Sequence, residues 1–290
     1  MALHEETQAG LAPWWLSAPA LLLFVALLLV PLILTLVLSF HTFSDVNGVM
    51  PGWTAGNYGE VLSDPYFGTI FLRTGALALA VTLLCLVLGV PETLILARMR
   101  RPWQGICLLV VLGPLLISVV VRTLGWSILL GNNGILNNAL RELGVIDEPL
   151  KLVFTFTGVV IALTHVLVPF MVMSVWASLQ RLDTQTEWAG LSLGASRWRV
   201  MRKVVLPQLV PGMLSGSIIV FALSASAFAT PALIGGRRLK VVATAAYDEF
   251  LGTLNWPLGA AIAVLLLIAN VAIVLGCNRL AERRFSQTFE

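Results

Sequence analysis

The stretch Glu187–Pro207, EWAGLSLGASRWRVMRKVVLP, is a positively charged polar interval between two long apolar runs. The five cations in it or just before it are Arg181, Arg197, Arg199, Arg202 and Lys203. Gly194 lies near its middle, and Pro207 closes it where the next apolar run begins. Glycine tolerates bends that other residues avoid, and proline favours a helix start. The pattern predicts two short helices joined by a bend at Gly194, lying against a membrane instead of crossing it.

The runs on either side have the length and composition of membrane spans. Of the 290 residues, 58% are hydrophobic and 11% are charged, roughly half the charged fraction of a soluble domain. Residues 14–40 and 152–180 contain no Asp, Glu, Lys or Arg, and about 20 apolar residues are enough for a helix to cross. The runs lack the alternation of membrane strands. We therefore predict an all-α integral membrane protein with six transmembrane helices, at 14–40, 67–97, 103–130, 152–178, 208–232 and 257–278.

The spans divide the chain into three predicted units. Residues 1–66 form an N-terminal tail, the first helix and an external loop; residues 67–278 form the core with its loop at 181–207; residues 279–290 form a tail. Lys and Arg are more numerous on the side of the 181–207 loop than on the opposite side. Because cytoplasmic loops carry this excess, we expect the 181–207 loop and both termini to be cytoplasmic.

Several functional classes lack their required residues. The chain has no G-x-x-x-x-G-K-[ST] phosphate loop, no H-E-x-x-H and no C-x-x-C. Its three cysteines lie in apolar runs and predict neither a disulfide nor a metal framework. The net charge of +3 is distributed among loops, which does not favour nucleic-acid binding. We expect no metal, no cofactor and no catalytic set on this chain, which argues against a membrane-integral enzyme.

A few polar residues lie inside or near the ends of the predicted spans. His165 lies within a span, and we favour a hydrogen bond between helices over a proton relay for it, because a relay needs ionisable neighbours in the membrane. Glu92 and Arg122 are the candidates for such neighbours, but Glu92 lies near the cytoplasmic end and is interpreted as interfacial. A stand-alone secondary transporter, the alternative from a different functional class, would need paired intramembrane charges and inverted repeats, and neither is clear.

Acidic residues gather on the predicted external side. They are Asp45, Glu60, Asp64, Glu142, Asp147, Glu148, Asp248 and Glu249. Solvated loop acids explain them, and so does a docking rim or an entry path for a cation, because a field of opposite sign concentrates a charged partner. On the same side, residues 131–138, GNNGILNN, predict a turn followed by a short surface helix that ends near Gly144.

The central loop resembles the EAA motif of the permease subunits of binding-protein-dependent ABC importers. The matching residues are Glu187, Ala189, Gly194, Leu206 and Pro207, with Glu-to-Gly and Gly-to-Pro spacings of seven and thirteen. Trp188 replaces the first Ala of the motif, and Met201 stands where Phe is common. Over roughly residues 65–278, the segments RTLGW (122–126), GNNGILNN (131–138), VPFMV (168–172) and FATPALIGG (228–236) look like the spermidine/putrescine permease branch.

This resemblance implies a type I ABC importer permease fold in a bacterial inner membrane. The expected partners are a cytoplasmic ATPase dimer, which carries ATP and Mg²⁺, a second permease, a periplasmic binding protein and membrane lipid. The residues expected to couple to the ATPase are Glu187, Trp188, Ala189, Gly194, Ala195, Leu206 and Pro207. Glu187 would pair with an ATPase arginine or cap backbone amides, and Pro207 and Pro211 would set the start of the fifth helix.

The translocation pathway is predicted from the same resemblance and from the external charges. Its candidate residues are Arg122, Trp126, Ser224, Phe228, Pro231, Asp248 and Glu249. In the fifth span, Gly212, Gly216 and neighbouring serines would serve either a gate or helix packing alone, and Phe228 with Pro231 would form an outer constriction. The expected substrate is a polyamine or a similar small cation, with phosphonate, opine, sulfate and iron as alternatives in the same importer class.

Overall fold

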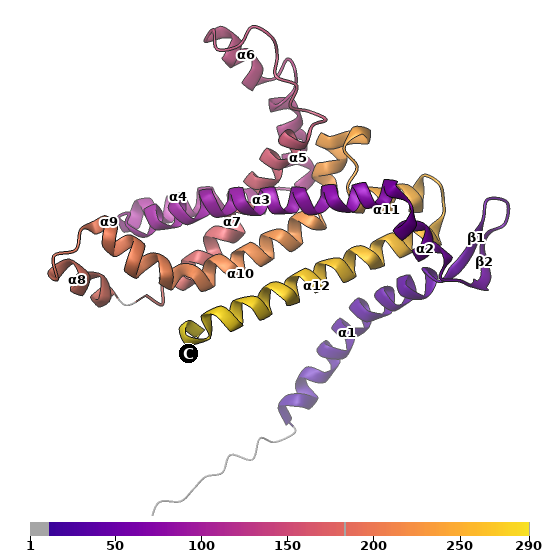
Figure 1. Ribbon diagram of the computed structural model, residues 1–290, viewed down its shortest axis with the longest axis horizontal. Coiled ribbons are helices and arrows are strands. Elements are labelled where there is room, and N and C mark those ends of the chain that lie inside the picture. Colours follow the sequence, from indigo (N-terminus) through magenta and orange to yellow (C-terminus); the bar gives the residue numbers. More distant parts are fainter. Residues whose placement is uncertain (1–11, 183, 290) are drawn as a thin grey trace, which may run out of the picture.

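Three long helices form the centre of the molecule. The computed structural model describes residues 12–182 and 184–289, and the side chains of 17–182 and 185–279 within them. Helices α3 (Pro65–Ala97), α7 (Phe156–Leu179) and α10 (Leu206–Ala225) pack side by side (Figure 1). Their facing side chains, among them Leu77, Val159 and Leu209, are fully buried in one apolar cluster. The core therefore lies among helices that the apolar runs predicted.

Two further helices flank this centre. Helix α1 (Ala12–Leu38) exposes large apolar side chains such as Leu22 and Phe24, and α12 (Trp256–Phe289) lies beside it. Apolar surface of this extent is stable against lipid, not water. Among the described residues, five helices are long and apolar enough to cross a membrane, or six if the bent pair α4–α5 counts as one span. The all-α membrane fold with six spans is confirmed on that count.

The third span is not the single helix that the sequence predicted. Helices α4 (Arg101–Leu116) and α5 (Val119–Leu129) meet at 101° across two extended residues, Ile117 and Ser118. Pro114 has no N–H, which weakens the last turns of α4. The guanidinium of Arg122 donates to the carbonyl of Pro114 and caps that helix end from beyond the break. A hydrophobicity pattern cannot reveal such a bend, because both halves are equally apolar.

The end of the molecule away from the 181–207 loop contains structure that the sequence did not predict. Strands β1 (His41–Ser44) and β2 (Gly48–Trp53) form an antiparallel hairpin, followed by α2 (Gly56–Ser63). Buried Asn57 donates to the carbonyls of Ser39 and His41 and fixes the hairpin to the end of α1. Helix α11 (Val242–Leu251) packs with α2, α3 and α12 in a second apolar cluster.

The predicted surface helix after GNNGILNN is confirmed as α6 (Ile135–Glu142), which ends at Leu143 and Gly144. The side chain of buried Asn137 bonds to the carbonyls of Gly131 and Leu150 and to the N–H of Leu150. Through Asn137, these bonds hold the turn before α6 against the segment that follows it. Helix α6 projects away from the body of the molecule, whereas α5 lies beside η2 (Figure 1).

The fifth span starts and ends earlier than predicted. Helical backbone runs without a break from Arg197 to Ala225, as α9 (Arg197–Val200), the π-helical turn η1 (Met201–Val205) and α10. Pro207 lies in the first turn of α10, as predicted, but helical backbone already begins at Arg197. The π-helical turn η1 is wider than an α-helical turn and precedes Pro207 and Pro211. Neither proline has an N–H to donate to the carbonyl four residues earlier.

Beyond Ala225 the chain forms turns instead of the predicted last two turns of helix. They are η2 (Pro231–Gly235) and η3 (Gly236–Arg238). The hydroxyl of Ser226 bonds back to the carbonyl of Ala222, and Pro231 cannot donate to the carbonyl of residue 227, so the helix is not propagated. Phe228 and Pro231 consequently lie outside the fifth helix.

The sixth candidate span, Trp256–Arg279, agrees with the predicted 257–278. Helix α12 continues beyond it to Phe289, so the predicted tail at 279–290 is helical where the structure describes it. Residues 1–11 of the predicted N-terminal unit lie outside the described residues. Helix α12 runs from the α11 end toward the end that carries α8 and α9 (Figure 1).

Candidate functional site

The predicted pair of short helices is present. Helix α8 (Thr184–Ser192) is followed by Gly194 with φ +82, and α9 begins after Ser196, whose hydroxyl accepts from the N–H of Arg199. A positive φ is the conformation in which glycine avoids the clash of a Cβ. The elbow formed by residues 184–205 thus takes its shape from one glycine and one capping serine.

The elbow contacts its own chain at Glu187 and at Gly190, among other residues. Glu187 in the first turn of α8 forms an ion pair with Arg98 at the end of α3, with 3.4 Å between Nη2 and Oε1. Gly190 lies against Val200, where an added Cβ would approach the valine side chain to 3.2 Å. The sequence predicted an arginine of the ATPase, or backbone amides, as the partner of Glu187. Within this chain, the structure pairs Glu187 with Arg98.

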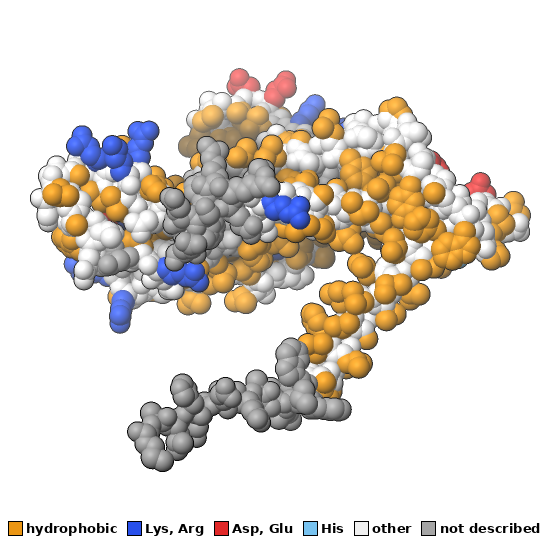
Figure 2. All heavy atoms as spheres, turned by 60° about the horizontal axis from the view of Figure 1, so that its bottom comes forward, with side chains coloured by type: hydrophobic (Ala, Val, Ile, Leu, Met, Phe, Trp, Pro, Cys, Tyr) orange, Lys and Arg blue, Asp and Glu red, His pale blue; other side chains and the backbone are white. Residues whose placement is uncertain are grey.

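Large apolar side chains of the elbow face outward. Trp188 is 69% exposed, Leu193 88% and Trp198 72%. Leu193 and Trp198 were not predicted as site residues. Their position close to the glycine bend is the sequence signal that could have identified them. Figure 2 shows Lys and Arg side chains gathered over this same end of the molecule. The elbow therefore presents aromatic and aliphatic groups within a basic surface.

The other predicted coupling residues divide between surface and core. Ala189 and Pro207 are exposed, and Ala195 is half-buried. Leu206 is half-buried and packs against the central apolar cluster. Leu206 of the motif thus connects the elbow to the helix core, whereas the exposed apolar side chains lie on both sides of Gly194.

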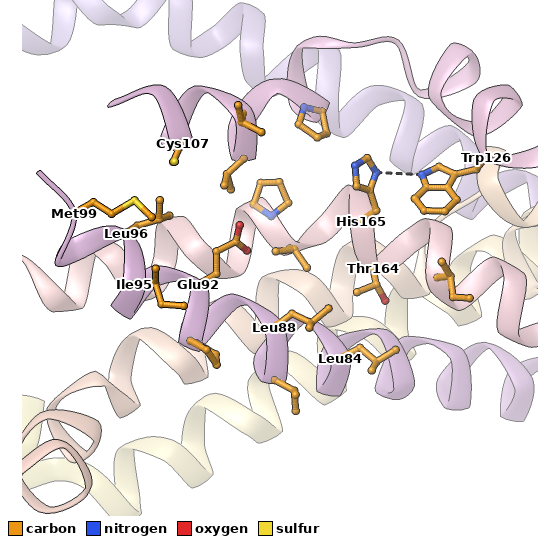
Figure 3. Close-up of a pocket in the computed structure, with 18 residues that line it drawn as sticks. Leu84, Leu88, Glu92, Ile95, Leu96, Met99, Cys107, Trp126, Thr164 and His165 are labelled. Carbon is orange, nitrogen blue, oxygen red and sulfur yellow. Dashed lines mark hydrogen bonds between the residues drawn. The ribbon is translucent and has the colours of Figure 1, made fainter. Parts of the chain in front are cut away.

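A cavity of about 1000 Å³ lies between α3, α4 and α7 (Figure 3). Its walls are mostly aliphatic, and the polar groups on them come from Glu92, Thr164, His165 and Trp126. The indole N–H of Trp126 donates to Nδ1 of His165 at 3.1 Å, which joins α5 to α7. The preference for an interhelical hydrogen bond at His165 is confirmed.

The carboxylate of Glu92 points into the cavity between α3 and α7. The sequence predicted an interfacial side chain two turns from Arg98, and it did not predict the cavity beside it. Sequence periodicity could have placed Glu92 on the same face of α3 as Leu84 and Leu88, which also line the cavity. It could not have shown that this face borders a cavity.

The predicted pathway residues do not form one site. Arg122 and Phe228 line a second cavity of about 300 Å³, and Trp126 lines the larger one. The Nε of Arg122 is buried and has no hydrogen-bond partner among the residues that the structure describes. Ser224 is buried, and its hydroxyl bonds to carbonyls of its own helix. Pro231 is buried in η2 and lines neither cavity, although the preceding residue, Thr230, lines the smaller one.

Asp248 and Glu249 lie on α11, at the opposite end of the molecule from the elbow. Asp248 forms an ion pair with Lys240 at 2.8 Å, and Arg73 donates to the Lys240 carbonyl. The hydrogen bond with Asp248, opposed by partial burial, raises the pKa of Lys240. Glu249 accepts a hydrogen bond from the hydroxyl of Thr253 at 2.6 Å. Both carboxylates therefore have partners in their own chain.

Comparison with known proteins identifies the family. The sequence model of the family described as binding-protein-dependent transport system inner membrane component matches residues 9–287. The chain belongs to this family. It is 34% identical to the spermidine/putrescine transport system permease protein PotB of Escherichia coli K12 over 267 residues, covering 92% of this chain and 94% of PotB. PotB of Salmonella typhimurium LT2 is also 34% identical, over 269 residues and 92% of each chain.

The fold agrees with solved importers. A bacterial alginate ABC transporter, in complex with an alginate pentasaccharide-bound periplasmic protein, contains a chain that superposes with a TM-score of 0.78. The alignment covers 93% of this chain and 94% of that chain at 16% identity. The chain is thus a permease subunit of an ABC importer with the type I permease fold, and a multi-pass membrane protein.

Proposed function

We propose that this chain is the permease subunit of an ATP-driven importer of polyamines such as spermidine and putrescine. The observation that carries the proposal is the 34% identity to PotB over 92% of the chain, which includes the elbow and the α3–α7 region. Polyamines are polycations, and acidic side chains at the α11 end suit the approach of such a cargo. In this role the chain catalyses no reaction; it provides a path and transmits force.

The elbow of residues 184–205 is the proposed contact with a cytoplasmic ATPase dimer. Exposed tryptophans are frequent anchors of protein interfaces, and Trp188 and Trp198 flank the glycine bend. ATP and Mg²⁺ would be held by the ATPase subunits, and this chain would bind no cofactor. Because the elbow continues without a break into α10, a rigid displacement of α9 would move the fifth span directly.

The proposed assembly needs two further proteins. A second permease would complete the pathway, and a periplasmic binding protein would deliver the substrate at the α11 end. The excess of Lys and Arg near the elbow supports a cytoplasmic location for that end and for both termini. The binding protein would select the substrate, so phosphonate, opine, sulfate and iron are the alternatives that the test must include.

The test is purification of a tagged chain from native membranes in mild detergent, followed by reconstitution in proteoliposomes. We expect an ATPase and a second permease to co-purify. We also expect ATP inside the vesicles to drive uptake of labelled spermidine when the binding protein is present outside. Uptake of sulfate, phosphonate, opine or iron in place of spermidine would overturn the substrate. Transport by the chain alone, without ATP, would overturn the importer function itself.

A further inference from the structure

Glu92 is unusual among the residues of the membrane helices. It is the one Asp or Glu within the candidate spans that the structure describes. Within the described part of the chain, its carboxylate has neither an ion pair nor a hydrogen bond. A carboxylate at membrane depth is costly and normally has a partner or a function. The partner of Glu92 must therefore come from outside this chain or from solvent.

Three prolines supply additional acceptors to the same cavity. Pro91 of α3, Pro114 of α4 and Pro169 of α7 all line it. A proline cannot donate to the carbonyl four residues earlier. Those carbonyls belong to Val87, Val110 and His165, which line the same cavity. In a membrane, backbone acceptors that lose their helical donor need another one, so the cavity combines a carboxylate with carbonyls that lack their regular donors.

The remaining polar lining is also short of donors. Thr164 is 5% exposed, and its hydroxyl has no hydrogen-bond partner within the described chain. The ring of Trp126 borders the cavity near His165 (Figure 3). An indole face attracts organic cations. Carboxylate, carbonyls and indole together match an alkylammonium group, which has a positive charge and three N–H donors.

We propose that this cavity is a transit site for a cationic cargo, in which Glu92 is the counter-ion of one ammonium group. The inference rests on the proposed function, because it assigns the polyamine a place within this subunit. The volume of about 1000 Å³ suits a small organic molecule and exceeds what a metal ion needs. The aliphatic walls would contact the methylene segments of the cargo while Glu92 holds its charged end.

Cys107 provides a direct reporter of occupancy. Its side chain lines the cavity, whereas Cys85 is buried in the core and Cys277 is exposed. In the complete importer carrying Cys277→Ser, a maleimide should label Cys107. We expect spermidine to slow this labelling in the presence of Glu92 and to have no effect in the Glu92→Gln variant. An uncharged diol of the same length should not protect.

Transport supplies the second measurement. We expect Glu92→Gln to lower spermidine uptake by roughly tenfold or more, the factor produced by losing one hydrogen-bond partner of a charged group. Glu92→Asp, which keeps the charge, should retain more uptake. The thermal stability of both variants in detergent shows whether they are folded.

The outcomes separate this inference from the proposed function. If the wild-type importer takes up no polyamine, the proposed function is wrong. If the wild type transports spermidine and Glu92→Gln does so equally well, only the transit site is wrong. Protection of Cys107 by the diol as well as by spermidine would show an apolar cavity without charge selection. Protection by Na⁺ alone would show a metal-ion site.

Discussion

Arg98 and Glu187 are separated by 89 residues in the chain and meet in an ion pair of 3.4 Å. Arg98 terminates α3, the helix that carries Glu92 into the cavity, and Glu187 lies in the first turn of α8. A carboxylate in the first turn of a helix is favourable in its own right. The pair therefore connects the elbow to a core helix that lines the proposed transit site.

The ion pair is too exposed to hold the fold together. The side chains of Arg98 and Glu187 are 58% and 36% exposed, and pairs in such surroundings contribute about 1 kcal/mol or less. Glu187→Lys should leave the amount of folded protein in the membrane unchanged while abolishing ATP-driven uptake, because the ATPase contact loses its acidic residue. Uptake by reconstituted vesicles and thermal stability in detergent are the two measurements.

Arg98→Gln is the matched control for that substitution. It removes the same ion pair but leaves the Glu187 carboxylate free for a partner protein, so most of the uptake should remain. Unchanged uptake in Glu187→Lys would contradict the coupling role. Equal losses in both variants would mean that the contact within the chain, not the ATPase, is what Glu187 serves.

Gly194 sets the angle between α8 and α9. An added Cβ would meet nothing within 4 Å, so its φ of +82 is the sole constraint against other residues. Gly194→Val should therefore cost about 1–3 kcal/mol locally and reduce uptake. Gly194→Asn should retain most activity, because Asn tolerates this region of backbone space. Comparable losses in the two variants would contradict a conformational explanation.

The sequence predicted those parts of the fold that follow from local pattern. The runs around α3 and α7 have a composition that only a membrane helix satisfies, and the Gly194 bend follows from residue chemistry. The break at Ile117 and Ser118 could not be predicted, because it depends on Arg122 reaching the Pro114 carbonyl across the bend.

The candidate site was predictable to a lesser degree for the same reason. The elbow is contiguous in sequence, so its residues could be named from spacing. The cavity combines side chains of four helices, and its acidic residue, Glu92, becomes notable only when α4 and α7 are placed around it. The β-hairpin after α1 was not predicted, because its two short strands lie in a segment whose composition is that of a loop.

Gly212 allows α10 to approach α7 closely. A Cβ there would lie 2.7 Å from the carbonyl oxygen of Ser174, a backbone atom that cannot move away cheaply. Gly212→Ala should therefore lower stability by about 1–3 kcal/mol, the usual cost of overpacking. Gly75→Ala in α3, where a Cβ meets nothing within 4 Å, should instead raise it by up to about 1 kcal/mol through helix propensity. Thermal unfolding followed by fluorescence would distinguish the two signs; a stable Gly212→Ala would contradict packing as the role of this glycine.

Asp248 and Glu249 are the acids for which the sequence suggested cation passage or docking of the binding protein. Replacing both, as Asp248→Asn with Glu249→Gln, should lower spermidine uptake or the affinity of the binding protein. Lys240→Met is the control, because it breaks the ion pair with Asp248 but leaves both carboxylates. If uptake and binding-protein affinity are both unchanged in the double variant, these acids serve the structure of α11 alone.

Lys240 also gives a pH-dependent prediction. Its pKa is raised in the folded state, first by the hydrogen bond with Asp248. A raised folded-state pKa means that the pair stabilises the protein fully below the unfolded lysine pKa, about 10.4, and loses this contribution as pH rises through the folded value. The Tm difference between wild type and Lys240→Met should thus be constant from neutral pH to about 9 and shrink above about 10.4. It should also be small, because the lysine side chain is 32% exposed and the pair is partly screened. A difference that already disappears between pH 7 and about 9 would mean that Asp248 does not hold the lysine in its charged form.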